Sequence, residues 1–135
     1  MMIVDTGVWV DYFNGTVNAE SDRLDYALEH EQVALTDLIL MEILQGFRSD
    51  RDHAQALALL SALPCFDTLG REQAVRYAAL YRSLRKRGIT VRKTNDVIIA
   101  GFCIEQDIPL LFRDKDFLPF VQHLGLQRVV AGAAN

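Results

Sequence analysis

Long apolar runs, a secretion signal and a disulfide framework are all missing from this sequence of 135 residues. The longest uninterrupted apolar run, Val97 to Ile104, has eight residues, whereas a membrane-spanning helix needs about 20. No charged leader followed by an apolar stretch and a cleavage site is visible. Cys65 and Cys103 lie apart among apolar neighbours, and we interpret them as small core residues in a reducing compartment. We therefore expect a cytoplasmic protein in which residues 1–135 form one domain, with 131–135 as a loose tail.

Groups for zinc binding and for nucleophilic catalysis are also scarce. Neither cysteine has a histidine nearby in the sequence, and no glycine-rich phosphate loop is present. The histidines lie in polar, outward-facing contexts; they are His30, His53 and His123. A net charge of −4 argues against a protein that coats nucleic acid. The side chains that remain as candidates for chemistry are carboxylates.

Acidic residues are absent from Gln73 to Asn95, a stretch that holds seven basic ones. A helix that ends before Gly88 would account for Arg85–Arg87, because cations stabilise a helix C-terminus. Arg92 and Lys93 lie beyond that glycine. Phosphate binding is therefore the alternative explanation for the basic stretch.

Short apolar strands alternate with amphipathic helices along the chain, without linkers or repeats. This order predicts an α/β fold, a three-layer α/β/α sandwich with a mostly parallel central sheet. Right-handed crossovers would then place every strand-to-helix turn along one edge of that sheet. The predicted strands are 1–4, 33–36, 65–69, 110–113 and 128–130, and the predicted helices are 8–13, 18–31, 37–44, 52–63, 71–87 and 95–106, with Thr36 and Thr94 as caps.

Asp5 and Glu42 occupy positions that are unusual for acids. The apolar residues before Asp5 predict a buried strand, so that Asp5 would lie where a central parallel strand opens onto a ligand-binding crevice. Glu42 sits in a helix that is apolar nearly all round, Leu38–Leu44, and a buried unpaired glutamate is rare. Its side chain would lean back toward the turn at Thr36. The alternative is a glutamate that faces solvent on a partly exposed helix.

Three further aspartates follow the same pattern, and each also has a structural explanation. Asp96 begins the apolar helix 97–104, where the helix dipole alone would favour an acid. Asp114 and Asp116 follow the strand 110–113, where either could cap the next short helix. Taken together, five carboxylates at one sheet edge would repel one another unless a cation neutralised them. An all-oxygen ligand set without histidine or cysteine favours Mg²⁺ or Mn²⁺ over zinc.

Four segments in this order and spacing resemble the PIN-domain ribonucleases, most of all the VapC toxins of bacterial VapBC toxin–antitoxin pairs. The segments are Ile3-Val4-Asp5-Thr6, Met41-Glu42-Ile43-Leu44, Asn95-Asp96-Val97-Ile98-Ile99-Ala100 and Leu110-Leu111-Phe112-Arg113-Asp114-Lys115-Asp116-Phe117. The resemblance implies a Mg²⁺- or Mn²⁺-dependent endonuclease acting on RNA. It also implies a homodimer held inactive by a cognate VapB-like antitoxin, with larger assemblies possible.

The resemblance also assigns roles to residues. Asp5, Glu42, Asp96 and Asp116 match the family's acidic quartet, Asp114 matches an additional ligand, and Thr6 matches a small hydroxyl beside the first aspartate. Asn95 departs from many relatives, and we expect this change to leave the acids untouched.

The resulting hypothesis is metal-assisted phosphodiester hydrolysis. Asp5 and Asp96 would hold a metal ion directly, and the other three acids would complete its shell, orient the attacking water or hold a second ion. Arg113 and the basic stretch 82–93 would steer the RNA backbone toward the acids. Exposed parts of the helices 9–13 and 38–44 are candidate antitoxin-docking surfaces.

Three alternatives remain open at this point. A receiver-type signalling domain would need a phospho-accepting aspartate, for which Asp67 is the only candidate. An Asp-x-Asp phosphatase would need a second acid where Gly7 stands. The third alternative is a PIN fold used only for protein binding.

Overall fold

Strands and helices alternate through residues 1–132, the part of the chain that the computed structural model describes. In chain order the elements are β1 (Met2–Val4), α1 (Thr6–Phe13), α2 (Ala19–His30), β2 (Val33–Thr36), α3 (Asp37–Gln45), α4 (Asp50–Leu60), β3 (Cys65–Phe66), α5 (Arg71–Lys86), α6 (Thr94–Gln106), β4 (Leu110–Leu111), the 3₁₀ turn η1 (Lys115–Phe117) and α7 (Leu118–Leu124). This order confirms the predicted α/β class.

The strand that ends before Asp5 lies inside the sheet, as its continuous apolar run predicts. The sheet has the order β3-β2-β1-β4, and all three pairings are parallel. Ile3 is opposite Ala34 of β2 on one side and Leu110 of β4 on the other. Since the chain runs outward from β1 in both directions, the end of β1 is the topological switch point at which such folds bind ligands.

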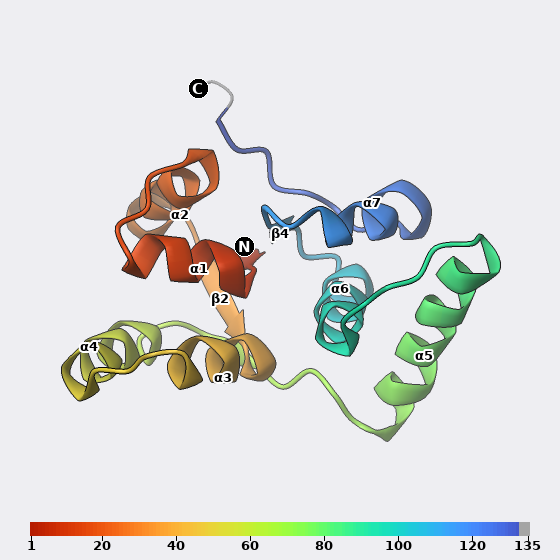
Figure 1. The fold of residues 1–135 in the computed structure, drawn as a ribbon, viewed down its shortest axis with the longest axis horizontal. Helices are drawn as coiled ribbons and strands as arrows, with labels where there is room; N and C mark the ends of the chain where they lie inside the picture. The colour runs from red at the N-terminus through yellow and green to blue at the C-terminus, as the bar shows by residue number, and fades with distance from the viewer. Residues whose placement is uncertain (133–135) are drawn as a thin grey trace.

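Helices cover the sheet from both sides. In Figure 1, α2 and α4 lie to the left of β2, α1 and α3 lie at its upper and lower ends, and α5 to α7 lie to the right with β4. The core between these layers is built from fully buried side chains, of which Trp9, Phe112, Phe117 and Phe120 are the largest. None of the helices within residues 1–132 is long and apolar enough to cross a bilayer.

Several predicted boundaries are wrong by a few residues, and capping explains most of the differences. Helix α4 begins at Asp50 because the Ser49 side chain accepts a hydrogen bond from the Asp52 backbone N–H. Thr36 caps α3 as predicted, at 3.1 Å from the Ile39 backbone nitrogen. Thr94, by contrast, is the first residue of α6 and not its cap.

The weakest strand predictions are shortened or lost. The predicted strand at 65–69 is reduced to the two residues of β3 at the sheet edge, so Cys65 is exposed and not a core residue. Cys103 is buried as expected. The predicted strand 128–130 is a single bridge between Arg128 and Leu110. Within the predicted tail Ala131 packs against the core, whereas residues 133–135 lie outside the described part of the chain.

Candidate metal centre

Asp5 lies at the C-terminal end of β1, where the strand turns into α1. Its backbone N–H donates a hydrogen bond of 2.9 Å to the Leu111 carbonyl, which fixes this turn against β4. The residue is only 7% exposed. The position predicted from the apolar run is therefore correct, and the side chain is held at the switch point between two neighbouring strands.

Glu42 meets this turn from α3, although by a different route from the one expected. The Thr6 hydroxyl donates a hydrogen bond of 2.7 Å to Glu42 Oε1, and Asn95 Nδ2 donates one of 3.1 Å to Glu42 Oε2. Glu42 thus contacts the turn after β1 and not the turn at Thr36. Helix α3 is also not buried all round, since Met41 is 57% exposed.

The contact with Asn95 corrects a second expectation. Asn95 was expected to leave the acids untouched, yet its amide anchors one of them. Each Glu42 oxygen now has a donor from a different element, one from α1 and one from α6. This arrangement fixes the carboxylate plane, as outer-shell donors commonly do at metal sites.

Asp96 is the most unusual acid of the group. It lies in the first turn of α6, is 7% exposed, and its Oδ2 atom is buried without a hydrogen-bond partner. A buried carboxylate oxygen is ordinarily satisfied, because an unsatisfied one costs about 1–3 kcal/mol or more. The helix dipole explains why an acid lies here, but it gives this oxygen no partner.

Asp114 and Asp116 complete a cluster with Asp96. One carboxylate oxygen from each of the three lies within 4.8 Å of the others. Asp114 also caps the turn η1, since its Oδ1 accepts a hydrogen bond of 2.9 Å from the Asp116 backbone N–H. The predicted cap at Asp114 therefore exists, and the structure brings three of the five predicted acids into one cluster.

A cleft of about 230 Å³ joins this cluster to the first strand. Asp114, and not Asp116, faces the same cleft as Asp5. Asp5 and Glu42 do not belong to the 4.8 Å cluster, whereas Asp96 and Asp114 belong both to the cluster and to the lining of the cleft. The residues that line the cleft are Asp5, Thr6, Gly7, Glu42, Lys93, Asp96, Arg113 and Asp114.

Crowding of these carboxylates changes their proton affinity. Burial, followed by the charge of Asp96 and then that of Glu42, raises the pKa of Asp5 to about 7, against the opposing effect of nearby backbone N–H groups. Burial also raises the pKa of Asp96 to about 6. The Lys93 ammonium lowers that pKa, while Asp114 and Asp116 raise it. The neighbouring cations therefore do not fully neutralise these carboxylates.

Cations from the predicted basic stretch lie beside the acids. Lys93 Nζ is 3.5 Å from Asp114 Oδ2, and Arg92 Nη2 is 3.2 Å from Asp116 Oδ2. The sequence placed both cations in a possible phosphate-binding stretch but gave no sign that they pair with these two acids. The loop 88–93, which contains both cations, therefore ends beside the candidate metal site.

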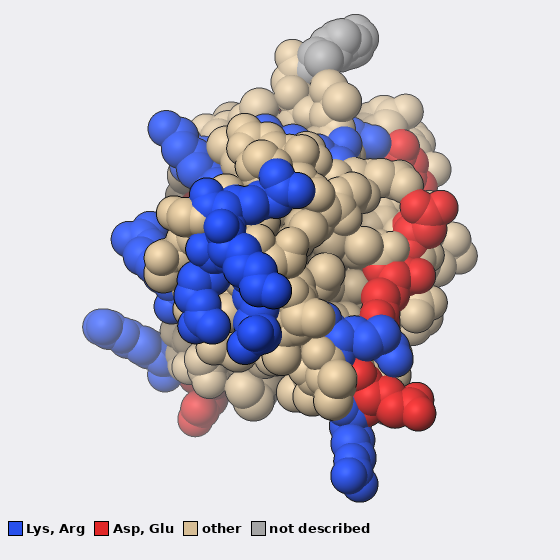
Figure 2. Space-filling view, turned by 90° about the vertical axis from the view of Figure 1, so that its right-hand side faces the viewer, with Lys and Arg blue, Asp and Glu red and all other residues tan. Residues whose placement is uncertain are grey.

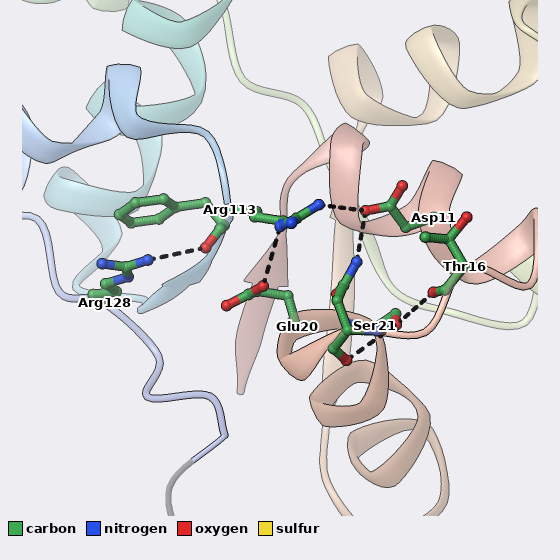
Figure 3. A network of polar contacts seen from close by, with 8 residues as sticks. Asp11, Thr16, Glu20, Ser21, Arg113 and Arg128 are labelled. Atoms are coloured by element: carbon green, nitrogen blue, oxygen red, sulfur yellow. Dashed lines mark hydrogen bonds and ion pairs between the residues drawn. The ribbon is translucent and has the colours of Figure 1, made fainter.

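Arg113 ties the turn after β4 to the N-terminal helices. Its guanidinium lies 3.8 Å from Asp11 of α1 and 3.6 Å from Glu20 of α2. In Figure 3 the side chain of Arg113 lies between these two acids, and the contacts continue from Asp11 toward the start of α2. Its expected role in steering RNA remains a prediction, and the structure adds a bracing role.

The donor set fits a divalent cation. All the candidate ligands are carboxylates, the type of ligand that Mg²⁺ and Mn²⁺ prefer. The unpartnered Oδ2 of Asp96 and the raised pKa values of Asp5 and Asp96 are both relieved by positive charge in the cleft.

Comparison with known proteins agrees with this geometry. The family model for the PIN domain matches residues 2–120. The chain belongs to the PIN-domain family. Ribonuclease VapC11 of Mycobacterium tuberculosis H37Rv is 34% identical over 122 residues, which cover 87% of this chain and 89% of that protein. Ribonuclease VapC1 of Methanocaldococcus jannaschii is 26% identical over 126 residues, with coverage of 93% and 85%.

Solved structures show the same PIN-domain fold. The VapBC2 structure from Rickettsia felis, bound to a promoter DNA fragment, matches with a TM-score of 0.75 and 18% identity, covering 95% of this chain and 96% of that one. VapBC-5 of Mycobacterium tuberculosis matches with a TM-score of 0.63 and 26% identity, covering 95% and 98%. PIN nucleases use divalent metal ions, and the acidic cluster of this PIN domain has the ligands for one.

Proposed function

We propose that this protein is a Mg²⁺- or Mn²⁺-dependent endoribonuclease that hydrolyses RNA phosphodiester bonds. The observation that supports this most strongly is the buried, unpartnered Oδ2 of Asp96 beside Asp114 and Asp116. A cluster of this kind is unfavourable without a cation, and a cation held by carboxylates is a common catalyst of phosphodiester hydrolysis. The relatives named as VapC ribonucleases support the same reaction.

Each acid has a role that its position supports. Asp96 and Asp5 would hold the metal directly, with Asp114 and Asp116 completing its shell. Glu42, fixed by two donors, is positioned to orient the attacking water and accept its proton. A bound divalent ion would lower the pKa of a water molecule bound to it and neutralise negative charge on the phosphate.

The cations beside the cleft have a complementary role. Lys93 lines the cleft and pairs with Asp114, so it is placed to contact a phosphate group that enters. It also lowers the pKa of Asp96, which keeps that carboxylate ionised and available for a cation.

We also propose that the protein is the toxin of a type II toxin–antitoxin pair. Its structural neighbours include toxin–antitoxin complexes, among them VapBC2 and VapBC-5. A VapB-like antitoxin is the expected partner, with a homodimer as the expected state of the toxin. An enzyme that acts on cellular RNA would work in the cytoplasm.

The receiver-domain alternative is not favoured by the geometry. Asp67, its only candidate phospho-acceptor, is exposed beyond the edge strand β3 and does not line the acidic cleft. A receiver would need its acceptor among the metal-binding acids. In a protein-binding module without catalysis, the buried oxygen of Asp96 that lacks a hydrogen-bond partner would be unfavourable and would serve no function.

The direct test is cleavage of total cellular RNA by the purified protein, followed by mapping of the new RNA ends. We expect cleavage in Mg²⁺ or Mn²⁺, no cleavage in EDTA, and a loss of at least about 100-fold in Asp96→Asn. Asp25→Asn makes the same chemical change at an exposed position of α2 and should cleave like wild type. Cleavage by Asp96→Asn at the wild-type rate would show that the proposed role of Asp96 is wrong.

A further inference from the structure

The last turns of α5 carry a group of cations that the proposed chemistry does not use. We name the exposed side chains Arg82, Arg85, Lys86 and Arg87 the α5 cationic face. Within residues 1–132, none of these four makes a salt bridge with an acid. Arg76, one and a half turns earlier on the same helix, does pair with Glu105. The α5 cationic face therefore differs from an ordinary surface of balanced charge.

Figure 2 views the molecule from the side on which α5 lies. It shows several Lys and Arg side chains gathered into one dense group with no Asp or Glu between them, while most of the acids in this view lie away from that group, on the right, with some basic side chains among them. The sequence explains this separation, because residues 73–95 contain no acid.

Helix capping accounts for only part of this group. Arg85 and Lys86 lie in the last turn of α5, where the helix dipole favours cations. Arg82 lies a turn earlier, and it faces Lys86 at a spacing of four residues, where like charges destabilise a helix by a few tenths of a kcal/mol. Binding of an anionic group would make the placement of Arg82 beside Lys86 favourable.

The surface around these side chains is hollowed. Arg82, Lys86 and Arg87 border one depression of about 440 Å³. Arg82 also borders a second hollow of about 420 Å³ between α5 and α6, together with Arg85 and Thr94. Arg82 thus borders both hollows, although apart from Arg82 and Arg85 the second is lined mainly by apolar and aromatic side chains such as Tyr77, Tyr81 and Val97.

This path leads from α5 to the acidic cleft. Thr94, at the far side of the second hollow, directly follows Lys93, which lines the cleft and pairs with Asp114. Arg92, the preceding residue, pairs with Asp116. The second hollow and the acidic cleft are therefore adjacent at Lys93 and Thr94, and Arg92 and Lys93 are the cations at this junction.

We infer that the α5 cationic face binds the phosphate backbone of a single RNA strand and guides that strand into the acidic cleft. The inference rests on the proposed function and assigns the surface by which the substrate is held. Tyr81 lies on the wall of the second hollow, with the Arg85 guanidinium 5.5 Å from its ring centroid. An aromatic ring beside an arginine is the pairing that single-stranded nucleic-acid sites use for bases and phosphates.

Charge also argues against a second copy of this chain as the occupant. A two-fold symmetric contact brings the same patch of both protomers together. A two-fold contact centred on this face would bring its cations close to those of the other copy, and like charges near one another across an interface are unfavourable. A polyanion is the complementary partner.

The test compares two double variants that remove the same charge. Arg82→Ala with Lys86→Ala removes two members of the α5 cationic face, and Arg48→Ala with Arg51→Ala removes two exposed arginines at the start of α4. Because alanine is the best helix former, the substitutions in α5 should preserve the fold, and circular dichroism checks this. Binding of a short fluorescein-labelled single-stranded RNA is measured in EDTA, where proposed cleavage cannot occur.

We expect Arg82→Ala with Lys86→Ala to weaken RNA binding roughly 20-fold at about 0.1 M salt, and to lower the salt slope of log K by about 1.4. The expectation follows from a slope of about 0.7 for each phosphate contact on single strands. The control double variant should bind within about twofold of wild type. Equal losses in both variants, or no loss in the first, would overturn the inference.

Two further readouts separate this inference from the proposed function. In Mg²⁺, the α5 variant should raise KM while kcat at saturating RNA stays near wild type. If wild type fails to cleave RNA but the binding difference persists, the function is wrong and the surface assignment stands. If sedimentation shows that the α5 variant loses a wild-type dimer without a change in RNA affinity, the face is a self-interface and the inference is wrong.

Discussion

Replacement of Asp5 by asparagine is expected to stabilise the metal-free protein while removing its activity. Burial and the charge of Asp96 raise the pKa of Asp5 from 3.8 to about 7. One pKa unit corresponds to about 1.4 kcal/mol, so at pH 8 the ionised carboxylate costs about 4 kcal/mol of folding free energy. An amide avoids this penalty but interacts less well with the backbone N–H groups of Thr6 and Gly7. We therefore expect a net gain of roughly 2–4 kcal/mol at pH 8.

The stability difference between Asp5→Asn and wild type should depend on pH. A carboxyl whose pKa is raised by folding binds its proton more tightly in the folded state, so the Asp5 contribution destabilises the protein progressively as pH rises from 3.8 to about 7. At pH 5.5 the penalty is about 2 kcal/mol, roughly half of its value at pH 8. The advantage of Asp5→Asn over wild type should shrink accordingly and vanish below the unfolded-state pKa.

Urea unfolding in EDTA, followed by the fluorescence of the buried Trp9, measures these differences at both pH values. Asp25→Asn is the matched control and should differ from wild type by less than about 0.5 kcal/mol. Addition of Mg²⁺ should stabilise wild type but have a smaller effect on Asp5→Asn, because only the former retains the full ligand set. An Asp5→Asn variant that is no more stable than wild type at pH 8, or whose advantage is the same at pH 5.5, would refute the electrostatic argument.

Two other predictions concern residues of α6. Asn95→Ala removes the donor to Glu42 Oε2 and should reduce Mg²⁺-dependent cleavage by about 10- to 100-fold with little change in unfolding free energy; unchanged cleavage would show that Glu42 needs no such anchor. Gly101→Ala would place a Cβ atom 2.5 Å from the Tyr77 ring where α6 packs on α5, and should cost about 1–3 kcal/mol in urea unfolding. Gly46→Ala, whose Cβ meets nothing closer than 3.5 Å, is its control and should be nearly neutral.

The elements of the fold were largely predictable because their signals are local. The apolar run before Asp5 identified the central strand, and the apolar helix after Asp96 identified α6. Cys65 was misassigned because an apolar neighbourhood in the sequence does not distinguish an edge strand from an interior one. The start of α6 was misassigned because Thr94 is a good cap by residue type, although the backbone places Lys93 at that position.

The contacts of the site were less predictable than its members. All five acids lie near one end of the parallel sheet, as the topology requires. The partner of Glu42 could not be inferred, because it depends on how α3 packs against α1 and α6, which periodicity does not encode. The same holds for Lys93 and Asp114, whose pairing joins two loops that are adjacent only in space.

The pairing of β1 with β4 makes the site a late product of synthesis. Strand β1 is made first, yet its second neighbour β4 and the bond from Asp5 to Leu111 come from more than 100 residues later in the chain. Contacts of such long range form only after the intervening chain is available. A nascent chain that has not yet emerged as far as Asp114 therefore has no closed cleft, and the proposed nuclease would acquire its full set of carboxylates only when its own translation is nearly complete.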